Sequence, residues 1–145
     1  MERLIEMLKR HEGEVKTNDR HVLYKCPAGF WTLGIGRNVD ANGGIGLSGD
    51  EVDYLLENDI LRVIKELKTE YSWFGDLDDV RKDAIINIAF NLGATRLRGF
   101  RRALAAMEAA NYSTAAAEFL DSKWRKDVKG RAVELANMIE TGAYL

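Results

Sequence analysis

The sequence predicts an α+β fold, mostly α, with a small β-rich lobe and a larger helical lobe joined by a long helix. Helical periodicity stops near residue 11 and returns near residue 48, and the interval between them is rich in glycine. After residue 78 the apolar pattern is helical throughout. We therefore predict one domain, 1–145, with a β-rich lobe at 13–50, a connecting helix at 51–70, and a helical lobe built from 1–12 with 71–145.

The first helix is predicted over residues 2–11, because its apolar side chains form one stripe and Gly13 is a suitable stop. Glu12 then lies at the carboxyl end of the helix, where the helix dipole does not favour an acidic side chain. This position indicates a role other than helix stability. The alternative is an ordinary exposed glutamate.

A β-hairpin is predicted around Cys-Pro-Ala-Gly at residues 26–29, since β-favouring residues stand on both sides of it. Pro27, the one proline of the chain, suits the turn and not a central strand. A third short strand is expected at 44–47. We expect this small sheet to pack against a helix, because two or three short strands are not stable alone.

The remaining chain is predicted to be helical. Ser48 and Glu51 have the spacing of a capping box, followed by an apolar period of about 20 residues. Later helices are expected from Asp78 or Asp79 to Gly93, at 101–110, from a Ser113 cap to residue 120, and at 131–140, with a basic connection at 122–130.

Composition is that of an ordinary soluble globular protein, with 46% apolar and 30% charged residues. Residues 96–131 hold nine basic and four acidic side chains, a local charge of +5. Such a region can attract an anionic polymer, such as cell-wall glycan or nucleic acid, or can be a solvated helical face. The first residues lack the apolar run of a signal peptide, and we find no transmembrane stretch, so we expect synthesis in the cytoplasm.

Three side chains are candidates for chemistry. Glu12 could act as a general acid if apolar neighbours raise its pKa, as glycosidic bond cleavage requires. Cys26, the one cysteine, cannot form an intramolecular disulfide and stands at a turn, although a lone cysteine is often a small buried hydrophobe. Thr32 offers a hydroxyl that could hold a water, or is a strand former. The apolar neighbours that we expect around Glu12 are Tyr24, Phe30 and Trp31.

Taken together, these residues resemble the phage-type lysozymes, glycoside hydrolase family 24, over essentially the whole chain. The resemblance rests on HEG at 11–13, on YKCPAGFWTLGIGRN at 24–38, on the helix at 80–93 and on Ser-Lys-Trp at 122–124. It implies hydrolysis of the β-1,4 bond between N-acetylmuramic acid and N-acetylglucosamine in peptidoglycan. Glu12 would be the proton donor, Cys26 would replace the family's usual Asp, and Thr32 would position the water.

The resemblance also implies supporting residues. Phe90 matches a substrate-contacting aromatic, Arg131 would hold Glu12, and Arg37 would pair with Asp59. There are departures: 13 residues separate Glu12 from Cys26, where the family usually has eight. A thiolate in place of a carboxylate leaves the anomeric outcome open, and other substrate-contact positions of the family do not match here, namely Asn38, Ala103 and Glu118.

We expect peptidoglycan glycan strands as the partner, with no cofactor, no metal, no nucleic acid, no stable membrane insertion and a monomeric state. The enzyme would stay in the host cytoplasm until released to the wall, or would be virion-associated. One rival function is a non-catalytic peptidoglycan-binding module on a lysozyme fold. A more distant rival is a nucleic-acid binder that uses the basic residues of 96–102.

Overall fold

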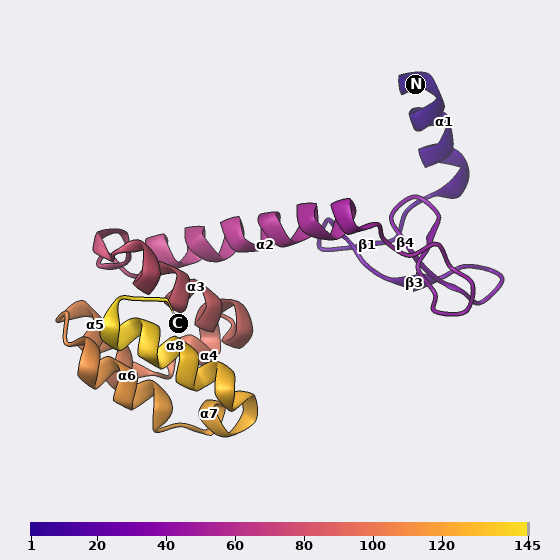
Figure 1. Cartoon of the computed structure of the whole chain (residues 1–145). Helices are drawn as coiled ribbons and strands as arrows, with labels where there is room; N and C mark the ends of the chain where they lie inside the picture. Colours follow the sequence, from indigo (N-terminus) through magenta and orange to yellow (C-terminus); the bar gives the residue numbers. More distant parts are fainter. Residues whose placement is uncertain (145) are drawn as a thin grey trace. The chain divides into compact units, whose positions relative to one another are not determined.

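The computed structural model describes residues 1–144 and confirms the predicted α+β fold class. The chain forms two compact units, Met1–Tyr54 and Leu55–Leu145. Helix α2 (Gly49–Glu70) runs through the boundary between them (Figure 1). In the described part of the chain, no helix has the length and apolar character needed to cross a membrane.

The first unit combines one helix with two small antiparallel sheets. Helix α1 covers Glu2–Glu12, and Gly13 ends it as predicted, with its N–H bonded to the Lys9 carbonyl oxygen. One sheet pairs β1 (Lys16–Thr17) with β2 (Arg20–His21); the other has the order β3-β4-β5, formed by Tyr24–Lys25, Trp31–Leu33 and Arg37–Asn38.

Two details of this unit differ from the sequence prediction. The third strand of the larger sheet is β5 and not residues 44–47, because Gly34 and Gly36, both at positive φ, turn the chain back just after β4. The β1–β2 hairpin was not predicted. Its two turn residues, Asn18 and Asp19, both have positive φ, which is the geometry of a tight two-residue hairpin turn.

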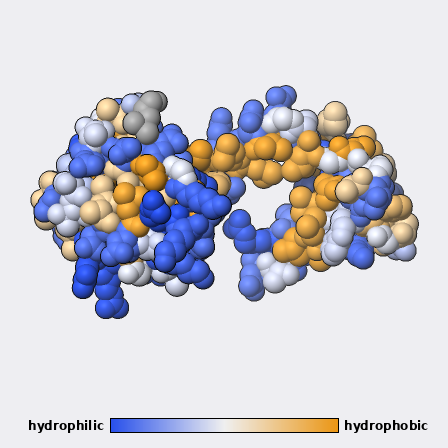
Figure 2. Space-filling model, turned by 60° about the horizontal axis from the view of Figure 1, so that its bottom comes forward, coloured by the Kyte–Doolittle hydropathy of each residue, from blue (hydrophilic) through white to orange (hydrophobic). Residues whose placement is uncertain are grey.

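The start of α2 carries the predicted capping box. The Ser48 N–H donates to Glu51 Oε2 at 3.1 Å, and the Glu51 N–H donates to Ser48 Oγ at 3.2 Å. Further along the helix, Val63 and Leu67 are buried in the core, whereas much of its other apolar surface is exposed. That surface is the orange band along α2 in Figure 2.

The second unit is helical. A 3₁₀ turn at Phe74–Asp76 leads into α3, which Asp78 caps by accepting the Arg81 N–H and which Gly93 ends, as predicted. The other helices are α4 (Ala94–Arg98), α5 (Arg101–Glu108), α6 (Tyr112–Leu120), α7 (Lys123–Val128) and α8 (Gly130–Thr141).

Two helix boundaries in the second unit correct the sequence prediction. Helix α6 is capped by Asn111, whose side chain accepts the Thr114 N–H, and not by Ser113. The segment expected to be a basic connection contains α7, which Ser122 caps by accepting the Arg125 N–H. The cap of α6 thus stands two residues earlier than the predicted one, and α7 is only six residues long.

The described apolar core lies in the second unit, between Val63 and Ile139. Helix α8 packs against α3, α6 and α7 (Figure 1). An aromatic cluster of Phe100, Phe119 and Trp124 lies where α5, α6 and α7 meet, and its ring centroids are 5.3 to 6.3 Å apart. Arg81 of α3 holds the carboxyl end of α8, because its guanidinium donates hydrogen bonds to the carbonyls of Ile139 and Glu140.

Candidate active site

Cys26 begins the turn that joins β3 to β4. The Cys26 N–H donates to the Phe30 carbonyl at 3.0 Å, and the Gly29 N–H donates to the Cys26 carbonyl at 2.8 Å. Pro27 supplies the fixed φ of the second turn position, and Gly29, at φ 86°, supplies the left-handed residue that closes a three-residue hairpin loop. The prediction that Pro27 lies in the turn is therefore confirmed, and the thiol is held at the end of a tight hairpin.

The hairpin turn lowers the pKa of the Cys26 thiol. The backbone N–H of Phe30 has the largest effect and lowers the pKa of the thiol from its ordinary value, helped by the N–H groups of Ala28 and Gly29 and by the Thr32 hydroxyl. Partial burial acts in the opposite direction. These donors stabilise the thiolate, the form that can accept a proton or attack carbon.

The strand register decides which side chains share a face with Cys26. Tyr24 lies opposite Thr32, and Lys25 lies opposite Trp31. Because side chains alternate along a strand, Cys26 and Thr32 share one face. Thr32 is 4% exposed, and its hydroxyl donates to the Phe30 carbonyl at 2.9 Å.

The same alternation places Trp31 on the other face of the strand. Trp31 was predicted to help surround Glu12, but it projects from the face opposite Thr32, where the Lys25 ammonium lies 5.1 Å from its ring centroid. Its side chain is 45% exposed. Glu12 is itself exposed, and the apolar environment expected for it stays a prediction.

Glu12 reaches the other end of the same strand. A Cβ placed on Gly36 would lie 3.1 Å from Glu12 Oε2 and 3.3 Å from its carboxyl carbon, so the acid lies directly over the Gly36 backbone. Gly36 also has φ 72°. Glycine is thus required there twice, for the turn after β4 and for the close approach of the carboxylate.

The strand β4 separates Glu12 from Cys26. The Gly36 turn follows its carboxyl end and the Cys26 turn precedes its amino end. At roughly 3.3 Å per residue, the stretch from Phe30 to Leu33 spans about 10 Å. This is a backbone length along the strand, and Glu12 and Cys26 lie near its two ends.

Arg37 and Asp59, predicted to pair with each other, each have a partner in their own unit. Arg37 Nη1 donates to Glu51 Oε2 at 2.8 Å and to the Gly46 carbonyl at 3.1 Å. The Arg37 guanidinium lowers the pKa of Glu51. Asp59 Oδ1 accepts from Arg62 at 2.8 Å. In residues 1–54 the ion-pair partner of Arg37 is therefore the capping-box glutamate, which the sequence reasoning did not foresee.

The structure brings Phe90 and Arg131 together. Both line a groove of about 570 Å³ in the second unit. Arg131 is held by Asn87, whose Oδ1 accepts from Nε at 2.9 Å and from Nη2 at 2.6 Å. Asn87 was missed from the sequence, although it stands one helical turn before Phe90. The contact of Arg131 with Glu12 would join the two units and stays a prediction.

Within residues 1–144 no group of His, Cys, Asp and Glu side chains is arranged to hold a metal ion. The small antiparallel sheets and the larger helical part are those of a lysozyme-like α+β fold.

The comparisons with known proteins agree with this class. The profile of the family described as Phage lysozyme matches residues 9–138. "Probable T4-type lysozyme 1" of Dictyostelium discoideum is 28% identical, over 94% of this chain and 93% of its own length. "Endolysin" of Acyrthosiphon pisum secondary endosymbiont phage 1 is 32% identical, over 96% and 89%. The "Pre-baseplate central spike protein Gp5" of Enterobacteria phage T4 is 30% identical over 96% of this chain and 28% of its own length.

The chain belongs to the phage lysozyme family. It is a glycoside hydrolase, a lysozyme that degrades peptidoglycan.

Proposed function

We propose that this lysozyme is a muramidase that hydrolyses the β-1,4 bond between N-acetylmuramic acid and N-acetylglucosamine, with Glu12 as general acid. The observation that carries the proposal is the placement of Glu12 over Gly36 at one end of β4, with the Cys26 thiol at the other end. The family membership supports the bond and the polymer.

In this mechanism the Glu12 carboxyl gives its proton to the glycosidic oxygen as the bond to the anomeric carbon breaks. The Cys26 thiolate accepts a proton from a water that attacks the same carbon, and the Thr32 hydroxyl, on the same sheet face, orients that water. Glu12 then regains its proton from solvent and Cys26 releases its proton, so the site returns to its starting state.

Attack by a water that Cys26 activates leads to inversion at the anomeric carbon. Inverting glycosidases use a base and a water on the face opposite the leaving group, whereas retaining enzymes form a covalent intermediate. We expect the first-formed product to be the α anomer, which NMR of a fresh digest would detect; a β anomer would indicate direct attack by sulfur.

The central experiment is Glu12→Gln, assayed by reducing-sugar release from purified peptidoglycan. We expect a loss of at least ~100-fold, the usual contribution of a general acid, with an unchanged melting temperature. Glu14→Gln is the matched control, because Glu14 is a nearby carboxylate already paired with Lys16 at 2.9 Å. Near-normal activity of the Glu12 variant would remove that residue from the chemistry.

The alternative is a peptidoglycan-binding module without catalysis, which would co-sediment with cell walls and release no reducing sugar. For location, we propose that the enzyme is held in the host cytoplasm until lysis. The relative whose name marks it as a baseplate spike protein supports the virion as the other possibility. Immunodetection in purified virions, compared with the host cytosol, would decide between the two.

A further inference from the structure

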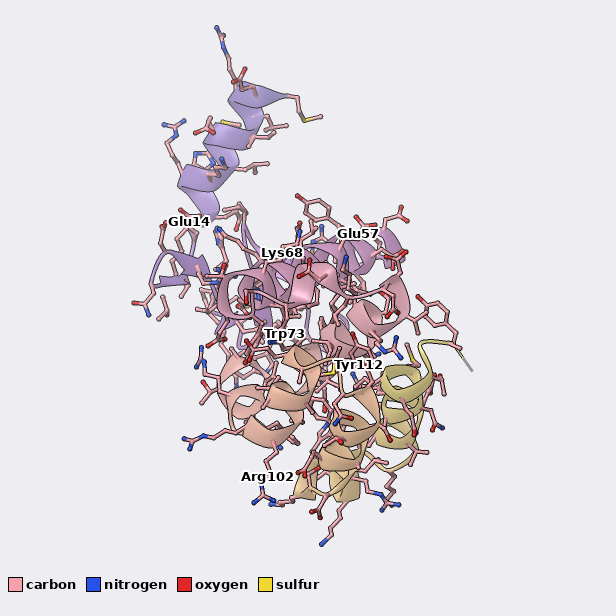
Figure 3. All side chains as sticks on the ribbon, turned by 90° about the vertical axis from the view of Figure 1, so that its left-hand side faces the viewer. Glu14, Glu57, Lys68, Trp73, Arg102 and Tyr112 are labelled. Atoms are coloured by element: carbon pink, nitrogen blue, oxygen red, sulfur yellow. The ribbon has the colours of Figure 1, made fainter. Side chains whose placement is uncertain are left out.

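The sheet face turned away from Cys26 carries an exposed tryptophan. Trp31 of β4 lies opposite Lys25 of β3, so the two side chains share that face. The Lys25 ammonium lies 5.1 Å from the centroid of the Trp31 ring, in cation–π contact. Of the three tryptophans of the chain, Trp124 is buried and Trp73 packs against the core of the second unit (Figure 3), whereas Trp31 is 45% exposed. The small sheet therefore presents a large apolar ring to solvent.

Asp40 fixes the backbone that carries this ring. Its Oδ2 accepts the Trp31 N–H at 2.9 Å, and its Oδ1 accepts the Asn42 N–H at 2.9 Å. These two N–H groups, the first with the largest effect, lower the pKa of the Asp40 carboxyl, and the positive charge of Lys25 acts in the same direction. The carboxylate is thus ionised near neutral pH. Trp31, Lys25 and Asp40 are called the tryptophan cluster below.

The tryptophan cluster keeps hydrogen-bonding groups available to a ligand. Among the hydrogen bonds and salt bridges of residues 1–144, none involves the indole N–H of Trp31 or the ammonium of Lys25. Both groups are hydrogen-bond donors only, so they suit the hydroxyl and carbonyl oxygens of a ligand that lies against the ring.

A sugar ring matches this combination of groups. The face of an aromatic ring carries partial negative charge, and the C–H groups on one side of a pyranose carry partial positive charge, so the two surfaces attract each other when stacked. The hydroxyl and acetamido groups at the edge of the sugar then reach the neighbouring donors and acceptors. A purely apolar ligand would leave the Lys25 ammonium and the Asp40 carboxylate unpaired, and Asp40 would repel a simple anion.

We propose that the tryptophan cluster is a second binding site for the glycan strand, with an N-acetylated sugar stacked on the Trp31 ring. Lys25 and the indole N–H donate to the acetamido carbonyl and to hydroxyl oxygens, and the Asp40 carboxylate accepts from a sugar hydroxyl. Because Cys26 and Thr32 lie on the other sheet face, both faces can hold glycan at the same time. This inference rests on the proposed function and extends it, because a second contact keeps the enzyme on an insoluble polymer between cleavages.

NMR of the Glu12→Gln protein tests the site without catalysis. Each tryptophan gives one indole N–H signal, and the signal that disappears in Trp31→Phe identifies Trp31. On titration with a β-1,4-linked trimer of N-acetylglucosamine, we expect this signal to shift. Cellotriose has the same linkage without acetamido groups and should bind about tenfold more weakly, since it lacks the carbonyl that accepts from the ammonium. An unmoved Trp31 signal, or equal binding of the two sugars, would overturn the proposal.

Variants in the Glu12→Gln background locate the binding, measured by co-sedimentation with purified sacculi. Trp31→Ala should weaken binding about tenfold, as loss of a central aromatic contact does, and Trp31→Phe, which keeps a ring, should recover much of it. Lys25→Met keeps the alkyl stem without the donors and should also weaken binding, by about threefold or more. Because Lys25 is exposed, this second variant tests the site even if Trp31→Ala does not fold.

Tyr54→Ala is the matched control, because Tyr54 is an exposed aromatic of α2 outside the tryptophan cluster and its loss should leave binding unchanged. A loss in this control as large as in Trp31→Ala would show that any exposed aromatic contributes, and would overturn the assignment. Unchanged binding in both Trp31→Ala and Lys25→Met would overturn it as well.

Kinetics separate this inference from the proposed function. On intact sacculi, Trp31→Ala alone should raise KM about tenfold with kcat unchanged, because the contact is the same before and during the chemical step. On soluble glycan fragments too short to reach both sheet faces, KM should rise little. An equal rise on both substrates would place the defect at the catalytic face and refute the second site.

The two proposals can fail independently. An active enzyme whose KM for sacculi does not respond to Trp31→Ala would refute the second site and leave the muramidase proposal in place. An inactive wild type whose Trp31 signal still shifts with the N-acetylglucosamine trimer would refute the catalytic proposal and retain the binding site.

Discussion

The two units hold their important side chains in place by different means. In residues 55–144 the apolar core, from Val63 to Ile139, fixes positions by close packing. In residues 1–54, Thr32 is the one buried side chain, and Cys26 and Glu12 are placed by hairpin turns, glycines and hydrogen bonds. The comparison suggests that stability depends mainly on the helical unit and chemistry mainly on turn geometry.

The largest expected effect is a loss of folding stability when the core of the helical unit is disturbed. Trp124→Ala removes a 2% exposed ring whose Nε1 donates to Asn91 Oδ1 at 2.8 Å. We expect a loss of about 3–5 kcal/mol in the free energy of unfolding, with kcat retained at low temperature. Urea unfolding and assays at low temperature would measure both, and an unchanged stability would contradict the role assigned to the core.

Substitutions of Cys26 test whether activity depends on the hairpin turn. Cys26→Ala should lose most of the activity, on the order of 100-fold, whereas Cys26→Asp should keep it, because an acid restores the proton acceptor. Melting temperatures should change little in either variant, since the thiol lies outside the apolar core. Full activity of the alanine variant would reduce Cys26 to a packing role.

The thiol also predicts a pH dependence. Because the Phe30 N–H and its neighbours lower the folded-state pKa of Cys26, alkylation by iodoacetamide should begin at a lower pH than for free cysteine. The associated stability is present above the unfolded pKa and is lost as pH falls through the folded value. The Thr32 side chain also lowers this pKa, so Thr32→Val should move the profile to higher pH. An unmoved profile would mean that the Thr32 hydroxyl does not affect the thiol.

Gly36 offers a smaller and more selective test. Gly36→Ala should displace the Glu12 carboxylate and lower activity about tenfold, beyond the ~1–2 kcal/mol that a left-handed alanine costs in stability. Gly34→Ala is the control, since Gly34 also has positive φ but a Cβ there would meet nothing within 4 Å. Equal losses of activity in the two variants would mean that strain alone is responsible.

The smallest effect concerns the start of α2. Ser48→Ala removes the capping hydroxyl and should cost about 1 kcal/mol, while the Arg37–Glu51 pair keeps the turn in place. Chemical denaturation should show this loss with activity almost unchanged. A large fall in activity would show that the capping box also positions the hairpin.

Much of the fold could be predicted because its signals are local. The capping box at Ser48, the Asp78 cap and the turn at Pro27 each depend on residues a few positions apart, and all three are confirmed. The Asn111 cap was missed because Ser113, two residues later, is an equally good capping residue by type. Helix α7 was missed because six residues are too few to show an apolar period.

The residues of the candidate site stay predictions from the sequence, and their contacts could not be predicted at all. Glu12, Cys26 and Thr32 could be selected from spacing and resemblance. Glu12 and Gly36, which lie close together, are 24 positions apart in the sequence. Arg131 and Asn87, which are joined by two hydrogen bonds, are 44 positions apart. No local rule links such residues, because their meeting depends on how the elements pack.

Arg81 has a practical consequence for the carboxyl end of the chain. Its guanidinium lies 3.8 Å from the centre of the Tyr112 ring, and a Cβ on Gly142 would come within 2.8 Å of its Nη1. Deleting residues back into α8 would remove the Ile139 and Glu140 carbonyls that accept from Arg81 and leave its guanidinium with Asp78 and the Tyr112 ring. Such shortened versions should therefore be less stable.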